Sequence, residues 1–153
     1  MDDHARDAIR RIFLNRRPHV NALLNAATWL GMSMKALRND IADGAIVAVE
    51  TGIGLRIPRE EMLALAMRAW PQAVIEEALG DEAPGVLPEA IRLVELRARV
   101  PRYQRDMLRA LARRNGTTVD EVLTRELEDV ACAHAEELAV LVPGFGAALA
   151  WPA

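Results

Sequence analysis

Residues 92–100, RLVELRARV, alternate apolar and charged side chains. This alternation predicts a β-strand with one apolar and one charged face, because successive side chains of a strand point to opposite sides. Pro101 ends the strand, since it has no N–H group to donate to a sheet. The apolar face consists of Val94, Leu96, Ala98 and Val100. The charged face consists of Glu95, Arg97 and Arg99.

Two helices are predicted after this strand. Asn115-Gly116 ends the first helix, because glycine readily adopts the left-handed conformation found at helix C-termini. Thr118 begins the second, and Glu121, three residues later, completes a capping box. The apolar stripe of the first helix is formed by Met107, Leu108, Leu111 and Ala112.

The predicted strand has no neighbour within this part of the sequence. A lone strand followed by two helices does not make a stable sheet. The simplest remedy is antiparallel pairing with the same strand of a second copy. The sequence therefore predicts a homodimer whose shared interface contains Val94, Leu96, Ala98 and Val100.

The stretch VELRARVPRYQRDMLRALARRNGTTVDEVLTRELEDVA (94–131) resembles the ribbon-helix-helix repressors of the Arc and MetJ type along its whole length. The order strand, proline, helix, Asn-Gly, Thr-Thr-Val, helix carries the resemblance. It implies a homodimer whose paired strands lie in the major groove of double-stranded DNA.

The resemblance also implies roles for single residues. Arginine reaches O6 and N7 of guanine together, and a glutamate accepts from N4 of cytosine, although Glu95 has the alternative of pairing with an arginine of the partner strand. Threonines at a helix N-terminus suit a phosphate. The DNA-facing candidates are Glu95, Arg97, Arg99, Arg102, Thr117 and Thr118, with Arg105 adding attraction to the backbone.

An earlier region, residues 20–70, contains the start and stop signals of two short helices. Asn25 is predicted to cap the first and Ser33 the second, with Gly31 making the turn between them. The second helix has Leu37 and Ile41 on its inner face and ends at Gly44.

A hairpin and a third helix are predicted next. Two β-prone runs, AIVAVE and LRIP, are joined by TGIG, which favours a tight turn. Pro58 then suits the start of a helix. The sequence thus predicts the order helix, turn, helix, hairpin, helix.

The string AATWLGMSMKALRNDIADGAIVAVETGIGLRIPREEM (26–62) resembles the winged helix-turn-helix of excisionase and MerR-like DNA-binding families. LGMS, the spacing of Leu37, Ile41 and Gly44, and RIPREE carry the resemblance. It implies that the second helix enters the major groove and that the hairpin contacts the backbone. The implied contact residues are Ser33, Lys35, Arg38 and Asn39, with Arg56 near a phosphate.

These patterns predict a mainly α fold with small β elements. The expected order begins with an N-terminal helix within residues 1–19, followed by a winged helix-turn-helix at 20–70. Within the first segment, residues 5–17 are amphipathic and Pro18-His19 break the pattern. A connector at 71–87, in which Gln72–Leu79 suit a short helix, then leads to a ribbon-helix-helix dimer unit at 88–142 and an apolar tail at 143–153. In the dimer unit, residues 131–142 are expected to extend the second helix. The tail contains Phe145, Leu149 and Trp151, and either packs on the body of the protein or binds a protein partner.

Charge is unevenly distributed. Residues 97–119 contain seven arginines and Asp106, a net charge of +6, whereas residues 120–153 contain one arginine and seven acids, a net charge of −6. A short basic segment of this kind is the electrostatic footprint expected for nucleic-acid binding, within a chain whose overall charge is −3.

The sequence predicts no enzyme, cofactor or metal. It contains no phosphate-binding loop, no dinucleotide-binding glycine motif and no nucleophile elbow, and His4, His19 and His134 lie far apart. Cys132 is the single cysteine, so a disulfide within one chain is excluded. With a charged N-terminus and no long apolar run, the chain is expected to be cytoplasmic and associated with the nucleoid, without membrane contact.

The predicted function is that of a sequence-specific DNA-binding transcriptional regulator, by default a repressor. Three alternatives stay open. The first is an antitoxin that binds operator DNA and uses the apolar tail to bind a toxin. The second is a DNA-organising or segregation protein, and the third is a protein-interaction adaptor.

Overall fold

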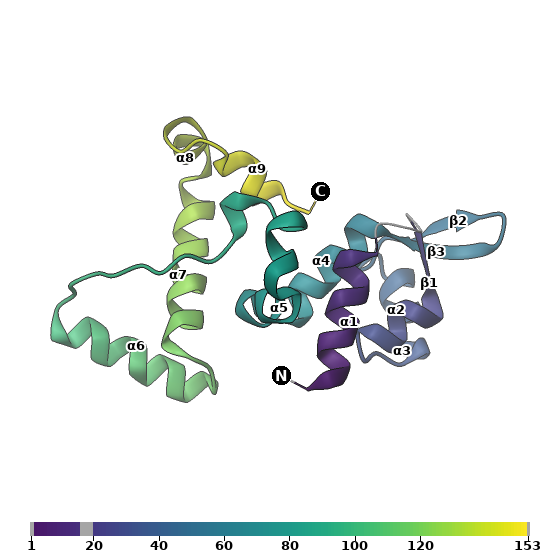
Figure 1. Cartoon of the computed structure of the whole chain (residues 1–153), viewed down its shortest axis with the longest axis horizontal. Coiled ribbons are helices and arrows are strands. Elements are labelled where there is room, and N and C mark those ends of the chain that lie inside the picture. Colours follow the sequence, from purple (N-terminus) through teal and green to yellow (C-terminus); the bar gives the residue numbers. More distant parts are fainter. Residues whose placement is uncertain (1, 16–19, 153) are drawn as a thin grey trace. The chain divides into compact units, whose positions relative to one another are not determined.

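The structure, a computed structural model, describes residues 2–15 and 20–152 (Figure 1). The chain divides into two compact units: unit 1 is Met1–Leu93 with Ala150–Ala153, and unit 2 is Val94–Leu149. It is mainly helical with small β elements, as the sequence predicts, and its strands form a small three-stranded antiparallel sheet. In the described part of the chain, no helix combines the length and apolar character needed to cross a bilayer.

Unit 1 begins with helix α1 (Asp3–Leu14). The Asp2 carboxylate caps it by accepting a hydrogen bond from the backbone N–H of Ala5 at 2.6 Å. The helix buries one face, formed by Ala8, Ile9, Ile12 and Phe13. It ends three residues earlier than the amphipathic pattern predicts, and the expected breaker Pro18-His19 lies outside the described residues.

Helices α2 (Leu23–Trp29) and α3 (Met34–Ala42) follow, separated by a tight turn at Gly31, where φ is +65°. Ser33 caps α3 as predicted, with its Oγ accepting from the N–H of Ala36 at 3.1 Å. The prediction that Asn25 caps α2 is wrong. The helix begins directly after strand β1 (Val20–Ala22), so the extended backbone of Ala22 already sets its entry and Asn25 lies inside it.

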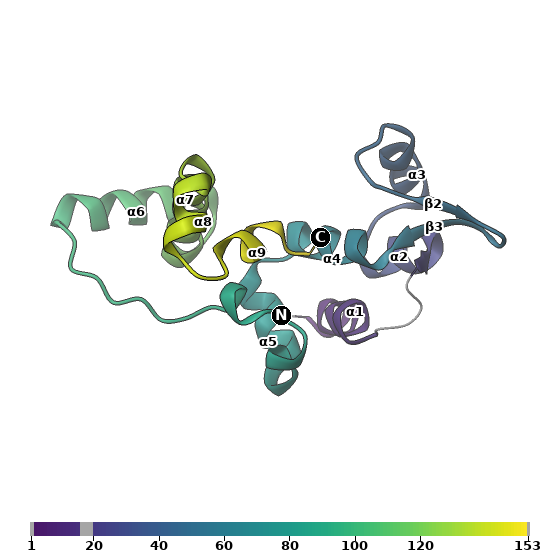
Figure 2. The same ribbon diagram turned by 90° about the horizontal axis from the view of Figure 1, so that it is seen from above.

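The sheet has the strand order β1-β3-β2. The predicted hairpin consists of β2 (Val49–Thr51) and β3 (Gly54–Pro58), with Glu50 opposite Leu55, and it projects from α2 and α3 (Figure 2). The sequence pattern does not predict β1, which pairs with the other edge of β3. Three residues are too few to show a periodicity.

The remaining elements of unit 1 complete one core. They are α4 (Arg59–Ala69), α5 (Gln72–Leu79) and two 3₁₀ turns, η1 (Gly80–Gly85) and η2 (Glu89–Ile91). The segment expected as a connector, 71–87, contains the predicted helix and also contributes to this core, because α5 packs along α1. The largest fully buried side chains are Phe13, Ile9, Leu37, Ile57, Met62, Ile75 and Leu79.

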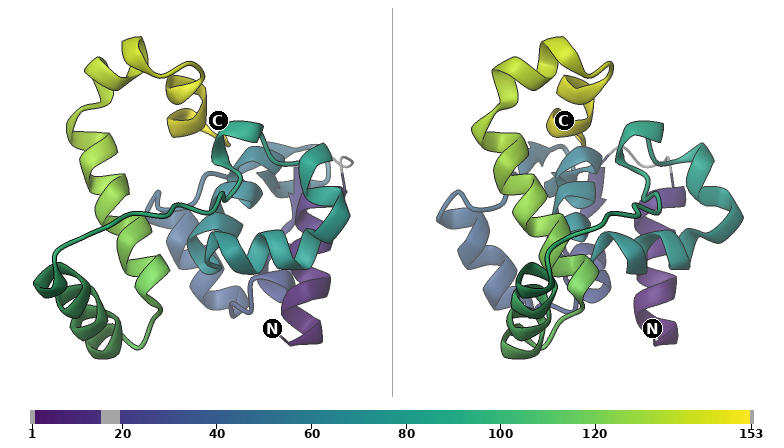
Figure 3. Two further views of the ribbon diagram at one scale, coloured as in Figure 1. Left: turned by 60° about the vertical axis from the view of Figure 1, so that its left-hand side comes forward. Right: turned by 90° about the vertical axis from the view of Figure 1, so that its left-hand side faces the viewer.

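Unit 2 contains helix α6 (Arg102–Asn115) packed against α7 (Val119–Ala133), with a left-handed Gly116 at φ +65° between them (Figure 3). Thr118 and Glu121 form the predicted capping box at the start of α7. Two short helices follow, α8 (Ala135–Leu141) and α9 (Phe145–Ala150). Residues 131–133 extend the second helix as expected, but it does not continue to residue 142, because the backbone of His134 leaves the helical conformation.

The strand predicted at 92–100 is not formed in the single chain. Residues 93–100 carry no regular secondary structure and appear as a long trace before α6 (Figure 1). The physical reason is that a strand needs a hydrogen-bonded neighbour, and no segment of the described chain pairs with this one.

Candidate nucleic-acid interface

The segment Val94–Val100 is exposed along its whole length. The fractional exposure of Val94 is 86% and that of Leu96 is 69%, values that are high for apolar side chains. The four predicted interface residues Val94, Leu96, Ala98 and Val100 are therefore not covered by any other part of the chain that the structure describes. An extended, apolar and unpaired segment is a template for pairing with another strand.

The charged side of this segment is partly neutralised within the chain. Arg97 donates from Nε to Glu95 Oε1 at 3.0 Å and from Nη2 to Glu95 Oε2 at 3.3 Å. Because this pair joins residues two apart, their side chains lie on the same side of the segment, as the predicted alternation requires. Arg99 makes no hydrogen bond or ion pair within the described chain, so its whole guanidinium is available to a ligand.

The start of α6 adds two further arginines, both beside one acid. Arg105 Nη2 lies 2.9 Å from Asp106 Oδ1, and Arg102 Nε lies 3.6 Å from Asp106 Oδ2. All three side chains are about half exposed or more, so these pairs are open to exchange with a phosphate. Arg102 is thus exposed as predicted but shares its charge with Asp106.

The start of α7, where Thr117 and Thr118 are expected to receive a phosphate, already contains a carboxylate. Glu121 Oε2 accepts from the N–H of Thr118 at 3.0 Å, and Thr118 Oγ1 accepts from the N–H of Glu121 at 3.1 Å. The Thr118 N–H lowers the pKa of Glu121, with smaller contributions from the Thr117 and Thr118 side chains and from Arg125. A phosphate at this helix start would have to share the site with the Glu121 carboxylate.

Helix α3 presents the second group of predicted residues. Leu37 is fully buried, which turns the opposite face of the helix outward. Lys35, Arg38 and Asn39 are exposed there, and their side chains make no hydrogen bond or ion pair within the described residues. The Ser33 hydroxyl is engaged as the helix cap, although it retains its own hydrogen to donate.

Arg56 lies on the central strand β3 and not at the tip of the hairpin. It is half-buried, and its Nη1 donates to the backbone carbonyl of Leu55 at 3.0 Å. The tip itself contains Ile53, which is 76% exposed, and no charged residue between Thr51 and Leu55. An approaching backbone would therefore meet an apolar tip with one arginine behind it.

Sequence reasoning missed the structural role of Arg59. Its guanidinium donates to the carbonyls of Ile12 at 2.8 Å, Phe13 at 2.9 Å and Asn15 at 3.1 Å, and so satisfies the C-terminal end of α1. A second missed contact joins Arg10 of α1 to the Ala78 carbonyl and to Glu82. These partners are distant in the sequence, so no local signal predicts them.

Side-chain hydrogen bonds also fix the last residues of unit 1 before unit 2 begins. The Glu76 carboxylate accepts from the N–H of Leu93 at 2.7 Å, and Gln72 donates to the carbonyl of Ile91. From the tail, Trp151 stacks on Phe13 with ring centroids 6.3 Å apart. Of the tail residues, Trp151 thus packs on unit 1, one of the two outcomes expected for the tail.

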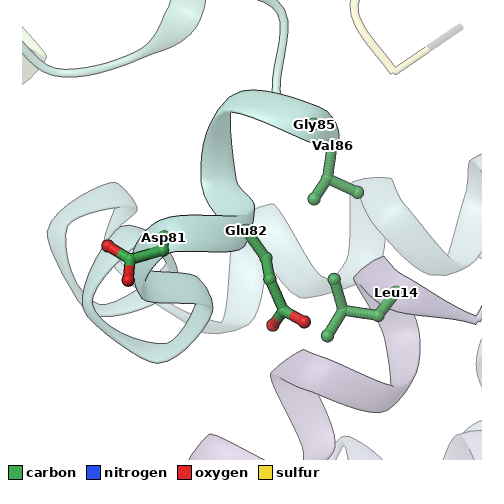
Figure 4. A pocket seen from close by; sticks show the side chains of 5 residues that line it. All are labelled: Leu14, Asp81, Glu82, Gly85 and Val86. Atoms are coloured by element: carbon green, nitrogen blue, oxygen red, sulfur yellow. The ribbon is translucent and has the colours of Figure 1, made fainter.

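A shallow surface pocket of about 390 Å³ opens between the end of α1 and η1 (Figure 4). Leu14, Asp81, Glu82, Gly85 and Val86 line it, and Glu82 is already paired with Arg10. Among residues 2–15 and 20–152, no group of three or more His, Cys, Asp or Glu side chains is arranged to hold a metal ion. The two carboxylates of the pocket, Asp81 and Glu82, are too few to form such a group.

No family model, curated protein or solved structure shows a detectable similarity to this chain.

Proposed function

We propose that the protein is a sequence-specific, double-stranded-DNA-binding transcriptional regulator that acts as a homodimer. One observation carries the proposal. The segment Val94–Val100 is exposed and unpaired, has an apolar side and a side carrying Arg97 and Arg99, and runs directly into the α6–α7 helix pair. This combination is what one protomer of a ribbon-helix-helix dimer presents before its strand pairs with that of the second protomer.

The packing of unit 2 supports the dimer. Within the described residues, only two of its side chains, Ala112 and Val122, are buried, which is too little apolar burial to hold 56 residues together. Large apolar side chains on its strand segment and helices remain exposed. They include Val94, Leu96, Val100, Tyr103, Met107, Leu127 and Val130. A second copy that covers them supplies the missing core.

Pairing of the strands sets up the DNA contact. When two copies join antiparallel with their apolar sides toward the helices, Arg97 and Arg99 of both copies point outward from a two-stranded ribbon. A two-stranded ribbon fits into the major groove, where arginine is selective for guanine. The net charge of +6 on residues 97–119 adds attraction to the phosphates.

Unit 1 supplies a second DNA contact in this proposal. Its elements follow the order of a winged helix-turn-helix, and α3 exposes Lys35, Arg38 and Asn39 on one face. The ribbon reads a central site while α3 of each copy reads flanking DNA. A dimer of this kind favours a near-palindromic operator, and it represses transcription simply by occupying DNA that polymerase needs.

The first test is a selection of bound sequences from a random duplex pool with the full chain at about 150 mM salt, which suppresses purely electrostatic binding. We expect an enriched inverted repeat. The variant Arg97→Ala/Arg99→Ala should lose about 1–3 kcal/mol of binding free energy per lost base contact and remain dimeric by sedimentation. Unchanged affinity of this variant would refute the ribbon as the reading element.

Other results of the same selection point to the other functions. Equal affinity for unrelated duplexes indicates a DNA-organising protein. A folded dimer that binds no DNA indicates a protein-interaction adaptor.

The C-terminal helices favour a second candidate, an antitoxin. Val140 is 85% exposed and Leu141 is 64% exposed, and among the described residues no side chain of α8 or α9 is buried. Such a surface suits an apolar protein partner. Co-purification of a second small protein with the intact chain, lost on truncation after Val142, would support the antitoxin function, and recovery of the chain alone would count against it.

A further inference from the structure

The contact between Glu95 and Arg97 uses a particular edge of the guanidinium. The two hydrogen bonds come from Nε and Nη2, at 3.0 and 3.3 Å from the two carboxylate oxygens. An arginine carries five N–H hydrogens: one on Nε and two on each Nη. This side-on contact consumes the Nε hydrogen and one Nη2 hydrogen, so both Nη1 hydrogens and the other Nη2 hydrogen stay free.

The free hydrogens form the end-on fork of the guanidinium. An arginine binds guanine by donating in parallel to O6 and N7, which needs two hydrogens on one edge. The Nη1–Nη2 edge of Arg97 provides them while Glu95 holds the other edge. The same carboxylate that neutralises the charge of Arg97 therefore leaves its base-reading edge intact.

Glu95 also restrains a side chain that nothing else holds. The Arg97 side chain is 86% exposed, and within the described chain Glu95 is its only hydrogen-bond partner. A long exposed arginine samples many rotamers, and fixing it costs binding free energy unless it is oriented beforehand. A carboxylate near phosphates, however, weakens attraction to all DNA.

We propose that Glu95 is a positioning residue for DNA selectivity: it orients Arg97 toward guanine, lowering affinity for DNA in general and raising preference for the correct base. This inference rests on the proposed DNA-binding function, and it assigns to Glu95 a role other than reading cytosine or pairing with the partner strand. It predicts that the effects of Glu95 and Arg97 on base preference are coupled.

The test uses the full chain with its selected duplex, a duplex in which the guanine opposite Arg97 is replaced, and an unrelated duplex. The ratio of the dissociation constants for the replaced and the selected duplex measures base preference. For Glu95→Gln we expect this ratio to fall roughly tenfold, as loss of a bidentate contact implies. Affinity for the unrelated duplex should rise, while the sedimentation coefficient of the dimer stays unchanged.

Two comparisons separate orientation from charge. Glu77→Gln removes the same charge from an exposed position on α5, and it should leave the ratio unchanged. In an Arg97→Ala background, Glu95→Gln should no longer change the ratio, because there is no guanidinium left to orient.

Three results would overturn the inference. A ratio unaffected by Glu95→Gln removes the positioning role. An effect that persists in the Arg97→Ala background means that Glu95 reads a base itself. An effect that disappears in an Arg99→Ala background but persists with Arg97→Ala indicates a cross-strand pair. If the wild-type chain enriches no sequence at all, the proposed function fails and this inference with it, whereas enrichment with an uncoupled Glu95 overturns this inference alone.

Discussion

The two units of this chain differ in how completely they bury their apolar side chains. Unit 1 closes a core from helices α1 to α5, the 3₁₀ turn η1 and a sheet, with Phe13, Ile9 and Leu37 fully buried. Unit 2 has helices with equally good start and stop signals but only Ala112 and Val122 buried among its described residues. The comparison teaches that local helix signals do not ensure a core. Whether a unit is complete depends on what covers its apolar faces.

The largest expected effect is that of Leu96→Asp, which tests whether unit 2 depends on a second copy. A carboxylate in the shared interface is strongly unfavourable, because it loses its hydration without gaining a partner. We expect a monomer by sedimentation and loss of hydrogen-exchange protection in α6 and α7, with protection in unit 1 retained. Arg99→Ala, on the charged side of the same segment, is the matched control and should remain dimeric. A dimeric, protected Leu96→Asp protein would contradict the proposed strand orientation.

Phe13→Ala tests the other half of the comparison. Phe13 is fully buried between the core and Trp151, so its truncation should cost unit 1 about 3–5 kcal/mol of unfolding free energy. The loss should be independent of protein concentration, because this core is formed within one chain. Denaturant unfolding at several protein concentrations measures both quantities. A midpoint for unit 1 that rises with concentration would show that its core also depends on a second copy.

Arg59→Ala tests whether the hydrogen bonds from Arg59 to the C-terminal end of α1 stabilise unit 1. The variant leaves the carbonyls of Ile12, Phe13 and Asn15 without a charged donor, and we expect a loss of about 2 kcal/mol of unfolding free energy. Arg68→Ala is the control, since the Arg68 side chain is mostly exposed and makes a single ion pair, with Glu61, which should contribute at most about 1 kcal/mol. Equal effects of the two substitutions would mean that the contacts of Arg59 with α1 add nothing.

The smallest expected effect concerns pH and the start of α7. Because the Thr118 N–H lowers the pKa of Glu121, the ionised carboxylate stabilises the folded state at pH values above the unfolded pKa. That contribution disappears as the pH falls through the lower, folded pKa. The difference in stability between the wild type and Glu121→Gln should therefore shrink on acidification. An NMR titration should place the Glu121 pKa below that of an ordinary glutamate, and a normal or raised value would contradict the capping box.

Glu128→Gln is the charge-matched control for this pH experiment, because Glu128 is an exposed residue in the middle of the same helix. Its side chain makes no hydrogen bond or ion pair within the described chain. Its substitution should not reproduce the pH-dependent difference.

Features that depend on neighbours within about four residues could be predicted from the sequence. Ser33, Thr118 and Glu121 start helices where predicted, and Gly31 and Gly116 take the left-handed conformation that the turns require. The hairpin and the helix after Pro58 are of the same kind. In each case the backbone group to be satisfied and the side chain that satisfies it are close in the chain, so composition and spacing suffice.

Which of these elements are covered depends on contacts between distant parts of the sequence. In the folded chain, β1 pairs with β3, α5 packs against α1, and Trp151 stacks on Phe13. Arg59 bonds to carbonyls 44 to 47 residues away, and Arg10 bonds to one 68 residues away. Contacts over such separations depend on the tertiary packing of the whole chain, because any local stretch is compatible with many distant partners. The strand predicted at 92–100 shows the same limit, since its alternation predicts a face for a neighbouring strand that the described residues do not provide.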